Sequence, residues 1–438
     1  MRSRIFSLGF LSLLLTWLFP VSLPADDTNY QNYLVGDRAA GMGGAVAATT
    51  ADLDACYYNP AGLADVSGSR VALSVSLYGI QSYRLKDGLG PGEDLKARQF
   101  ETIPSTFGSI LKASDDLALA FAVLTPDSLN SNISHSFERR PDRPGVERSD
   151  YYDATLDDST LWIGPSLGWR AGERLKVGAG VYVVYRSLVD KQDWAYLYTT
   201  SDTREVVEVR TRVYNINYTN YGLLGMAGTQ YELSEEFVLG AVVQTPTWNI
   251  TGDGELLYAV SLGSPEDDQL IQAKNMKSRN NLPAKFSLGA AWRKAGLFTL
   301  EGNLSYHLPT SYQLLAGEDV WTGRPVTTEL RRKGVVNFNL GGEYRLAGNY
   351  PLRAGIFTNL SSSPGIDESD PAGSQEKIDM YGVSFSVGNE SEHTTISLGV
   401  NYVWGKGETV GIGEDFQPTV VDQRESHLFL FLSSAYIF

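Results

Sequence analysis

The connections between hydrophobic segments constrain this sequence more than the segments themselves. Fourteen segments of the 438-residue chain alternate large apolar residues with small or polar ones at period two, which is the signature of β-strands. The links between them alternate strictly between turns of two or three residues, such as Gly172-Glu173, and long polar stretches, such as 126–158. The segments cover 69–84, 103–113, 116–125, 159–170, 174–188, 218–232, 236–249, 282–294, 297–308, 333–346, 351–361, 377–388, 392–405 and 425–438. Short turns on one side and long loops on the other are typical of an outer-membrane β-barrel.

The end of the chain and its tryptophans favour lipid around that barrel. The last segment is apolar on both faces and ends at Phe438, which resembles the signal read by the barrel assembly machinery of bacterial outer membranes. Trp169 and Trp292 lie near short turns and Trp404 near a long loop, as two interfacial girdles require. A soluble β-sandwich or propeller would also alternate, but no ~40-residue blade repeat is visible. We therefore predict an all-β, fourteen-stranded antiparallel transmembrane barrel.

The N-terminus predicts export. Two arginines precede an apolar run from Ile5 to Leu23, and a small residue, Ala25, follows. This pattern indicates a cleaved signal peptide over 1–25; the alternative is an N-terminal membrane anchor. With the barrel, it places the protein in the outer membrane of a Gram-negative bacterium. The single cysteine, Cys56, excludes an intramolecular disulfide, and a formal charge of −15 argues against a nucleic-acid partner.

Residues 36–64 contain too few large apolar side chains to form a core of their own. The stretch is rich in Gly and Ala and closes on Tyr58-Asn59-Pro60-Ala61-Gly62-Leu63. Gly permits tight turns, and Pro60 biases Asn59 away from helix. An even number of strands leaves both termini on the short-turn, periplasmic side. We expect 26–68 to form a hatch that plugs the lumen from that side, and 69–438 to form the barrel.

The hatch resembles that of a known family. Gly41-Met42-Gly43-Gly44-Ala45 and the later Asn59-Pro60-Ala61 are similar to the N-terminal hatch of the FadL family, outer-membrane transporters of long-chain fatty acids and aromatic hydrocarbons. Leu282-Pro283-Ala284-Lys285 and Leu352-Arg353-Ala354-Gly355 extend the resemblance along the barrel. It implies fourteen strands behind a hatch and a capture groove built from the third and fourth outer loops. Here the third loop, 206–217, reads as strand instead.

The resemblance also implies a side exit, because family members open laterally at a kink in the third strand. In this chain the third segment ends at Thr125-Pro126, and Pro165 interrupts the fourth. Pro cannot donate to a ladder. We therefore expect a weakened seam between the third and fourth strands.

Alternation assigns a set of barrel side chains to the lumen, and the hatch candidates come from its small residues and its Asn-Pro-Ala triplet. Cations there would hold a carboxylate head group, and aromatic walls would hold an apolar tail. The alternative is that lumen Arg and Glu residues, including Glu301 and Glu343, pair to brace barrel and plug. Arg186 and Arg353 are the foremost head-group candidates. The full set of ligand candidates is Arg186, Arg353, Lys285, Arg345, Phe357, Phe429 and Phe431, and the hatch or gating candidates are Gly41, Gly43, Gly44, Asn59, Pro60 and Ala61.

These features predict passive, substrate-gated uptake of a hydrophobic small molecule, with outer-membrane lipid as the other partner and no cofactor. A docking barrel for protein secretion or surface assembly and a general porin are the alternatives. No enzyme is expected. The four histidines, His135, His307, His393 and His427, lack metal-ligand spacing, and Ser426 and His427 point to opposite faces of a strand.

Overall fold

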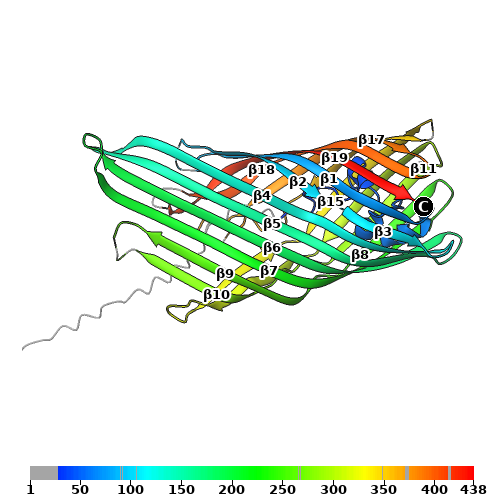
Figure 1. The fold of residues 1–438 in the computed structure, drawn as a ribbon, viewed down its shortest axis with the longest axis horizontal. Helices are drawn as coiled ribbons and strands as arrows, with labels where there is room; N and C mark the ends of the chain where they lie inside the picture. The colour runs from blue at the N-terminus through cyan, green and yellow to red at the C-terminus, as the bar shows by residue number, and fades with distance from the viewer. Residues whose placement is uncertain are drawn as a thin grey trace, which may run out of the picture.

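The fold is a single closed antiparallel sheet (Figure 1). The computed structural model describes residues 28–438, apart from 89, 91, 105, 265, 267, 348, 370–373 and 413–415. The first strand pairs with the last, from Arg70 opposite Ile437 to Leu85 opposite Gln423, and this pairing closes the barrel. The predicted signal peptide over 1–25 lies outside the described residues.

The described residues form nineteen strand segments and three short helices. The strands are β1 (Arg70–Leu85), β2 (Leu95–Pro104), β3 (Thr106–Lys112), β4 (Leu117–Arg143), β5 (Val146–Arg170), β6 (Leu175–Thr200), β7 (Val206–Glu232), β8 (Phe237–Gln244), β9 (Trp248–Ser261), β10 (Gln269–Ser278), β11 (Lys285–Lys294), β12 (Phe298–His307), β13 (Thr310–Glu318), β14 (Pro325–Arg332), β15 (Val335–Leu346), β16 (Tyr350–Asn359), β17 (Lys377–Glu390), β18 (Thr394–Ile412) and β19 (Pro418–Ile437). The helices are α1 (Asp37–Gly41), α2 (Ala55–Tyr58) and the 3-10 helix η1 (Pro60–Asp65). None of the described helices is long and apolar enough to span a membrane.

The nineteen segments make the fourteen predicted crossings, because five crossings consist of two segments each. The paired segments are β2 with β3, β8 with β9, β10 with β11, β12 with β13, and β14 with β15. Four of these breaks fall at or beside a proline, namely Pro104, Pro246, Pro283 and Pro309. Proline lacks the N–H that a continuous ladder needs, so each of these strands stops and restarts.

Four strands run far beyond the bilayer, which corrects the expectation of long polar loops. β4, β5, β6 and β7 contain 27, 25, 26 and 27 residues. At ~3.3 Å per residue and a tilt of ~40°, each reaches ~65 Å along the barrel axis, against an apolar band of about 25 Å. The predicted loops at 126–158 and 189–217 are therefore largely strand. The reading of 206–217 as strand is confirmed, since it lies in β7.

The seam between the third and fourth strands, which was predicted to be weak, is paired over most of its length, and its register shifts between Leu124 and Asp127, at Thr125-Pro126. β4 and β5 pair without interruption from Leu117 opposite Trp169 to Leu124 opposite Trp162, and Pro165 lies within that ladder. Pro165 acts on its other side, where the β5–β6 register skips from Ile163 to Ser166. A strand residue has one edge toward each neighbour, and the proline removes the donor toward β6.

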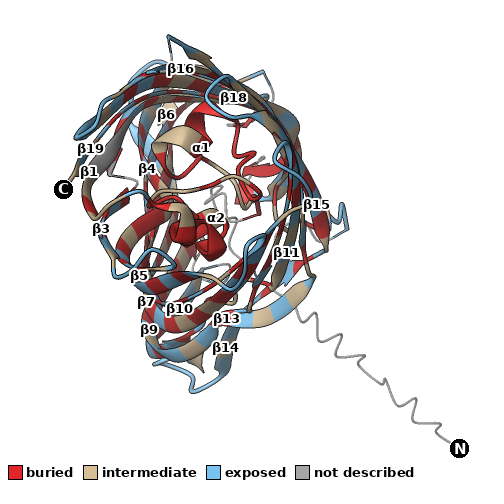
Figure 2. Cartoon of the chain, turned by 90° about the vertical axis from the view of Figure 1, so that its right-hand side faces the viewer, coloured by how far each residue is buried: buried red, intermediate tan, exposed pale blue. Residues whose placement is uncertain are grey.

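Residues 33–66 lie inside the barrel, near the end that carries the C-terminus (Figure 2). Nearly all of them are buried. Glycines in the wall allow the hatch backbone to come close: a Cβ at Gly178 would lie 2.2 Å from the carbonyl carbon of Pro60, and one at Gly341 2.2 Å from the carbonyl oxygen of Met42. Small residues therefore occur on both sides of this contact.

Substitution at Gly341 tests this fit. Gly341→Val should displace the hatch, because the added atoms overlap the Met42 carbonyl. Overpacking at a site whose neighbours can move typically lowers stability by only ~1–3 kcal/mol, so we expect a larger effect here. We expect increased channel conductance in planar bilayers and faster protease cleavage within 33–64. Gly342→Val is the matched control, since its Cβ would have no described neighbour nearer than 3.8 Å. Equal conductance in the two variants would contradict the hatch packing described here.

Candidate functional site

The hatch is fixed to the lumen by side chains that reach its backbone. Asn339 donates to the carbonyl of Gly43 at 2.6 Å, and Asn303 donates to that of Gly44 at 3.1 Å. Gly43 and Gly44 have φ of +63° and +79°, values that side chains disfavour, so the turn that presents these carbonyls depends on glycine. Glu301 accepts from the backbone N–H of Ala48 at 2.6 Å. Glu301 is thus a brace, the alternative role considered for it.

The Asn59-Pro60-Ala61 triplet anchors the same unit. The Asn59 side chain donates to the carbonyls of Ala47 and Thr229, at 2.7 and 3.0 Å, and accepts from the N–H of Ala61 at 3.1 Å. It therefore caps η1 and ties the hatch to β7 at once. Gly41 lies against β17, where a Cβ would be 2.1 Å from the Ser386 hydroxyl oxygen.

A second group of charged residues braces the base of the barrel. Glu343, almost fully buried, accepts from Arg38 of the hatch at 3.2 Å and from Arg345 and Arg353 of the wall at 3.2 and 2.7 Å. Glu390 completes the network with contacts of 2.6 Å to Arg345 and 2.8 Å to Arg353. Pairing of this kind offsets the cost of burying these charges. Arg345 and Arg353, predicted as head-group ligands, are therefore already engaged by carboxylates.

The three predicted aromatic wall residues pack against the hatch. Phe357, Phe429 and Phe431 are each at most 3 % exposed and share one apolar cluster with Tyr33 and Leu34. The rings of Tyr33 and Phe429 meet edge to face, with centroids 6.0 Å apart. These phenylalanines hold the plug rather than line an open passage.

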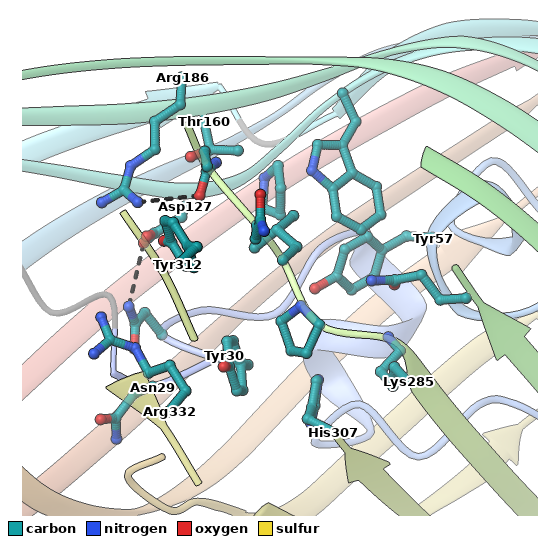
Figure 3. Close-up of a pocket in the computed structure, with 18 residues that line it drawn as sticks. Asn29, Tyr30, Tyr57, Asp127, Thr160, Arg186, Lys285, His307, Tyr312 and Arg332 are labelled. Carbon is teal, nitrogen blue, oxygen red and sulfur yellow. Dashed lines mark hydrogen bonds between the residues drawn. The ribbon is translucent and has the colours of Figure 1, made fainter. Parts of the chain in front are cut away.

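A cavity of about 70 Å³ lies between the hatch and the barrel wall (Figure 3). At about 10–15 Å³ per water, it has room for several water molecules. Hatch and barrel both contribute to its lining, which consists of Asn29, Tyr30, Asn32, Tyr57, Pro126, Asp127, Thr160, Trp162, Arg186, Gln244, Asn280, Asn281, Leu282, Pro283, Lys285, His307, Tyr312 and Arg332. Aromatic rings with a few convergent polar groups are typical of a small-molecule site.

Two of the predicted cations reach this cavity, and their environments differ. Arg186 makes a two-pronged contact with Asp158, with distances of 3.0 and 2.6 Å, and both residues are buried. Lys285 lies beside Tyr57 (Figure 3), with its ammonium 5.2 Å from the centre of that ring, and forms no ion pair among the described residues. An aromatic face attracts a cation without neutralising it, so such a cation can still meet an incoming anion. Lys285 is thus the predicted head-group candidate whose charge the structure leaves uncompensated.

The sequence did not single out several residues that shape the cavity. Tyr57 belongs to the hatch motif but carries no signal of its own. His307 stacks on Tyr30 with ring centres 4.4 Å apart, although the two are far apart in sequence. The ring of Trp162 lies tilted against that of Tyr57, with ring centres 5.3 Å apart. Period-two alternation placed His307 and Trp162 on strands, but only the closed sheet brings them to one cavity.

The hatch also contains a buried carboxyl group, that of Asp54, whose charged form is disfavoured by its surroundings. Asp54 is 3 % exposed; Thr50 donates to one of its oxygens at 2.8 Å, and the other has no hydrogen-bond partner among the described residues. Burial raises the pKa of Asp54 to about 7, with further increases from the charges of Asp52 and Asp37. Over the part of the chain that the structure describes, no group of three or more His, Cys, Asp or Glu side chains is arranged to hold a metal ion.

Comparisons with known proteins give one family. The profile described as "Outer membrane protein transport protein (OMPP1/FadL/TodX)" matches residues 29–425. A comparison with curated protein sequences finds no match. Similar solved structures include a Pseudomonas aeruginosa FadL homologue, at 15 % identity, 96 % of this chain, 100 % of that chain and a TM-score of 0.65.

Two further structures share the fold. The P. putida toluene transporter TodX has 16 % identity, with 92 % of this chain and 98 % of that chain covered and a TM-score of 0.65. The CymD monoaromatic hydrocarbon channel has 15 % identity, with 92 % and 97 % covered and a TM-score of 0.60.

Asp54 makes hatch stability depend on pH. Below the ordinary pKa of about 3.9 the carboxyl is protonated whether the hatch is docked or released, and it contributes nothing. Between about 4 and 7 only the released form ionises, so the hatch loses stability as pH rises, and above 7 the loss is complete. We expect amide hydrogen exchange in 52–58, corrected for intrinsic rates, to be faster at pH 8 than at pH 5. Asp54→Asn should remove most of that difference; an unchanged difference would contradict the assignment.

Proposed function

Because this chain belongs to the outer membrane transport protein family (OMPP1/FadL/TodX), we propose that it admits amphipathic molecules with an anionic head group by passive diffusion. The Lys285 ammonium, placed over the Tyr57 ring in the lumen cavity, carries this proposal. A long-chain fatty acid has the required chemistry: a carboxylate for the cation and a tail for the aromatic walls.

The energetics favour a passive process. Moving an acyl chain out of water gains ~0.8 kcal/mol per methylene, so apolar walls capture such a molecule without an energy source. The hatch is tied to the wall through Asn59, Asn303 and Asn339, which favours a path beside it over one that removes it. The protein acts in the outer membrane, in contact with its lipid. We infer that the signal peptide directs export and that the assembly machinery reads the last strand.

The alternatives receive less support. A general porin needs a water-filled lumen. Here the hatch occupies one end of the lumen, and buried aromatic side chains of the barrel wall pack against it. A docking barrel for secretion needs neither a lumen cavity nor an uncompensated cation. We assign the chain no reaction, and treat His307 as a lining residue stacked on Tyr30.

Removing the Lys285 charge tests the head-group assignment. Lys285→Met keeps the apolar stem but loses the ammonium, and a lost charged contact of this kind slows uptake about tenfold or more. We expect that decrease for a labelled oleate entering liposomes that contain the protein, with toluene uptake unchanged. Lys285→Arg should retain most oleate uptake.

Arg331→Ala is the matched control for net charge, because Arg331 is 72 % exposed and lies outside the cavity. Equal losses of oleate and toluene uptake in Lys285→Met would make Lys285 a structural residue. Sugar uptake by the unmodified protein would favour a porin, and uptake of none of the three probes would favour a docking barrel.

A further inference from the structure

Four basic side chains lie in one row across neighbouring strands on the outside of the barrel. The register sets Arg84 of β1 opposite both Lys96 of β2 and Arg424 of β19, and it sets Arg424 opposite Lys406 of β18. All four side chains are exposed and alternate with buried lumen residues, so they face outward. Neighbouring strands lie ~4.8 Å apart, which makes this basic row ~14 Å wide.

The basic row lies at the outer edge of the lipid-facing band. Lys406 lies twelve residues from the start of β18 at Thr394, which is ~30 Å along the axis at ~3.3 Å per residue and a tilt of ~40°, whereas the apolar band is about 25 Å tall. On the same face of β18, just on the bilayer side of Lys406, the rings of Tyr402 and Trp404 stack with centres 5.5 Å apart. Such aromatic residues mark the level of lipid headgroups. The row therefore faces headgroups and not hydrocarbon.

The charge of the basic row is compensated only at one end. Asp94 lies 2.7 Å from Arg84 and 3.9 Å from Lys96. Arg424 and Lys406 form no ion pair among the described residues. Like charges directly opposite one another destabilise a sheet, so a row of this kind is favourable only when an anion lies against it.

The wall formed by β5, β6, β7 and β9 differs in charge at the corresponding place. There Tyr185 and Tyr221, which pair across β6 and β7, take the position that Tyr402 has on β18. Two rows further out, where the other wall has the basic row, the register sets side by side Asp157, Val189, Asn217 and Glu255. The positive charge thus belongs to one wall and is not a general feature of the outer interface.

The surroundings of the basic row limit where an anion can lie. One row further out, Glu408 is directly opposite Asp422, and both are exposed, so a phosphate there would be repelled. On the bilayer side, Phe100 of β2 and Leu428 of β19 expose apolar surface to lipid. A ligand that fits both neighbours carries its negative charge at the headgroup level and has apolar chains that extend into the bilayer.

We propose that the basic row binds a phosphorylated glycolipid of the outer leaflet, with phosphates against the four cations and acyl chains along the apolar wall below. Guanidinium groups bind phosphate through two parallel hydrogen bonds, and a row ~14 Å wide accommodates more than one phosphate of a headgroup. This site lies on the outside of the barrel. It is separate from the cavity of Lys285 and does not depend on the proposed uptake function.

Native mass spectrometry of the purified protein with lipid A, an acylated disaccharide that carries two phosphates, tests this site. EDTA is present, so that no divalent cation bridges a phosphate to Glu408 or Asp422. The double variant Arg424→Gln, Lys406→Gln should raise the Kd for lipid A about tenfold or more, because each cation at a headgroup contributes separately. Dephosphorylated lipid A should bind the unmodified protein more weakly by a similar factor.

Lys191→Gln with Lys274→Gln is the matched control, because it removes the same charge from exposed positions on β6 and β10. Its Kd should stay unchanged, and the charge-retaining pair Arg424→Lys, Lys406→Arg should keep most of the affinity. Equal weakening in the two glutamine variants, or equal binding of dephosphorylated lipid A, would overturn the site. Equal affinity for phosphatidylglycerol, or for the deacylated phosphosugar, would overturn the assignment to a glycolipid.

Discussion

Pairing of the backbone governs this structure. Hydrocarbon offers no partner for a peptide N–H or C=O, so a chain that crosses the outer membrane as strands must close its sheet. The β1–β19 ladder provides that closure. The breaks at Pro246 and Pro309 are tolerated because each crossing resumes in a second segment. Between β2 and β4, where the described residues form no ladder, the side chains of Glu101 and Gln99 contact the β4 backbone instead.

A closed barrel of this size leaves a lumen that its own side chains do not fill, and the hatch fills one end of it. The fit depends on small residues in both partners and on polar side chains that reach the hatch backbone. Asn303 and Asn339 contact carbonyls that glycine turns present, and Glu343 gathers three guanidinium groups at the base. The lumen charges near the hatch are thus largely used to hold it, which sets Lys285 apart.

The periplasmic half was more predictable than the outer half. The predicted segment 174–188 begins within a residue of β6, which starts at Leu175 but continues to Thr200. The predicted segment ends twelve residues before the strand does, at 188 instead of Thr200, for a physical reason. Beyond the bilayer the outward face meets water, so polar residues such as Lys191 and Asp193 replace the lipid-facing ones, and the strand reads as a loop. Pro165 was misread for a similar reason, since sequence does not show which edge of a strand a missing donor faces.

Sequence alone determined the class of fold, the number of crossings, the hatch and the family, because these follow from local periodicity, turn length and small-residue composition. It also supplied a set of candidate lumen residues. Only the tertiary structure decided their roles, because charge pairing depends on which side chains of neighbouring strands and of the hatch meet in the lumen. Arg353 meets Glu390 and Arg186 meets Asp158, whereas Lys285 meets an aromatic ring. Which cation remains available to a ligand is a property of closure in three dimensions, and no spacing along the chain records it.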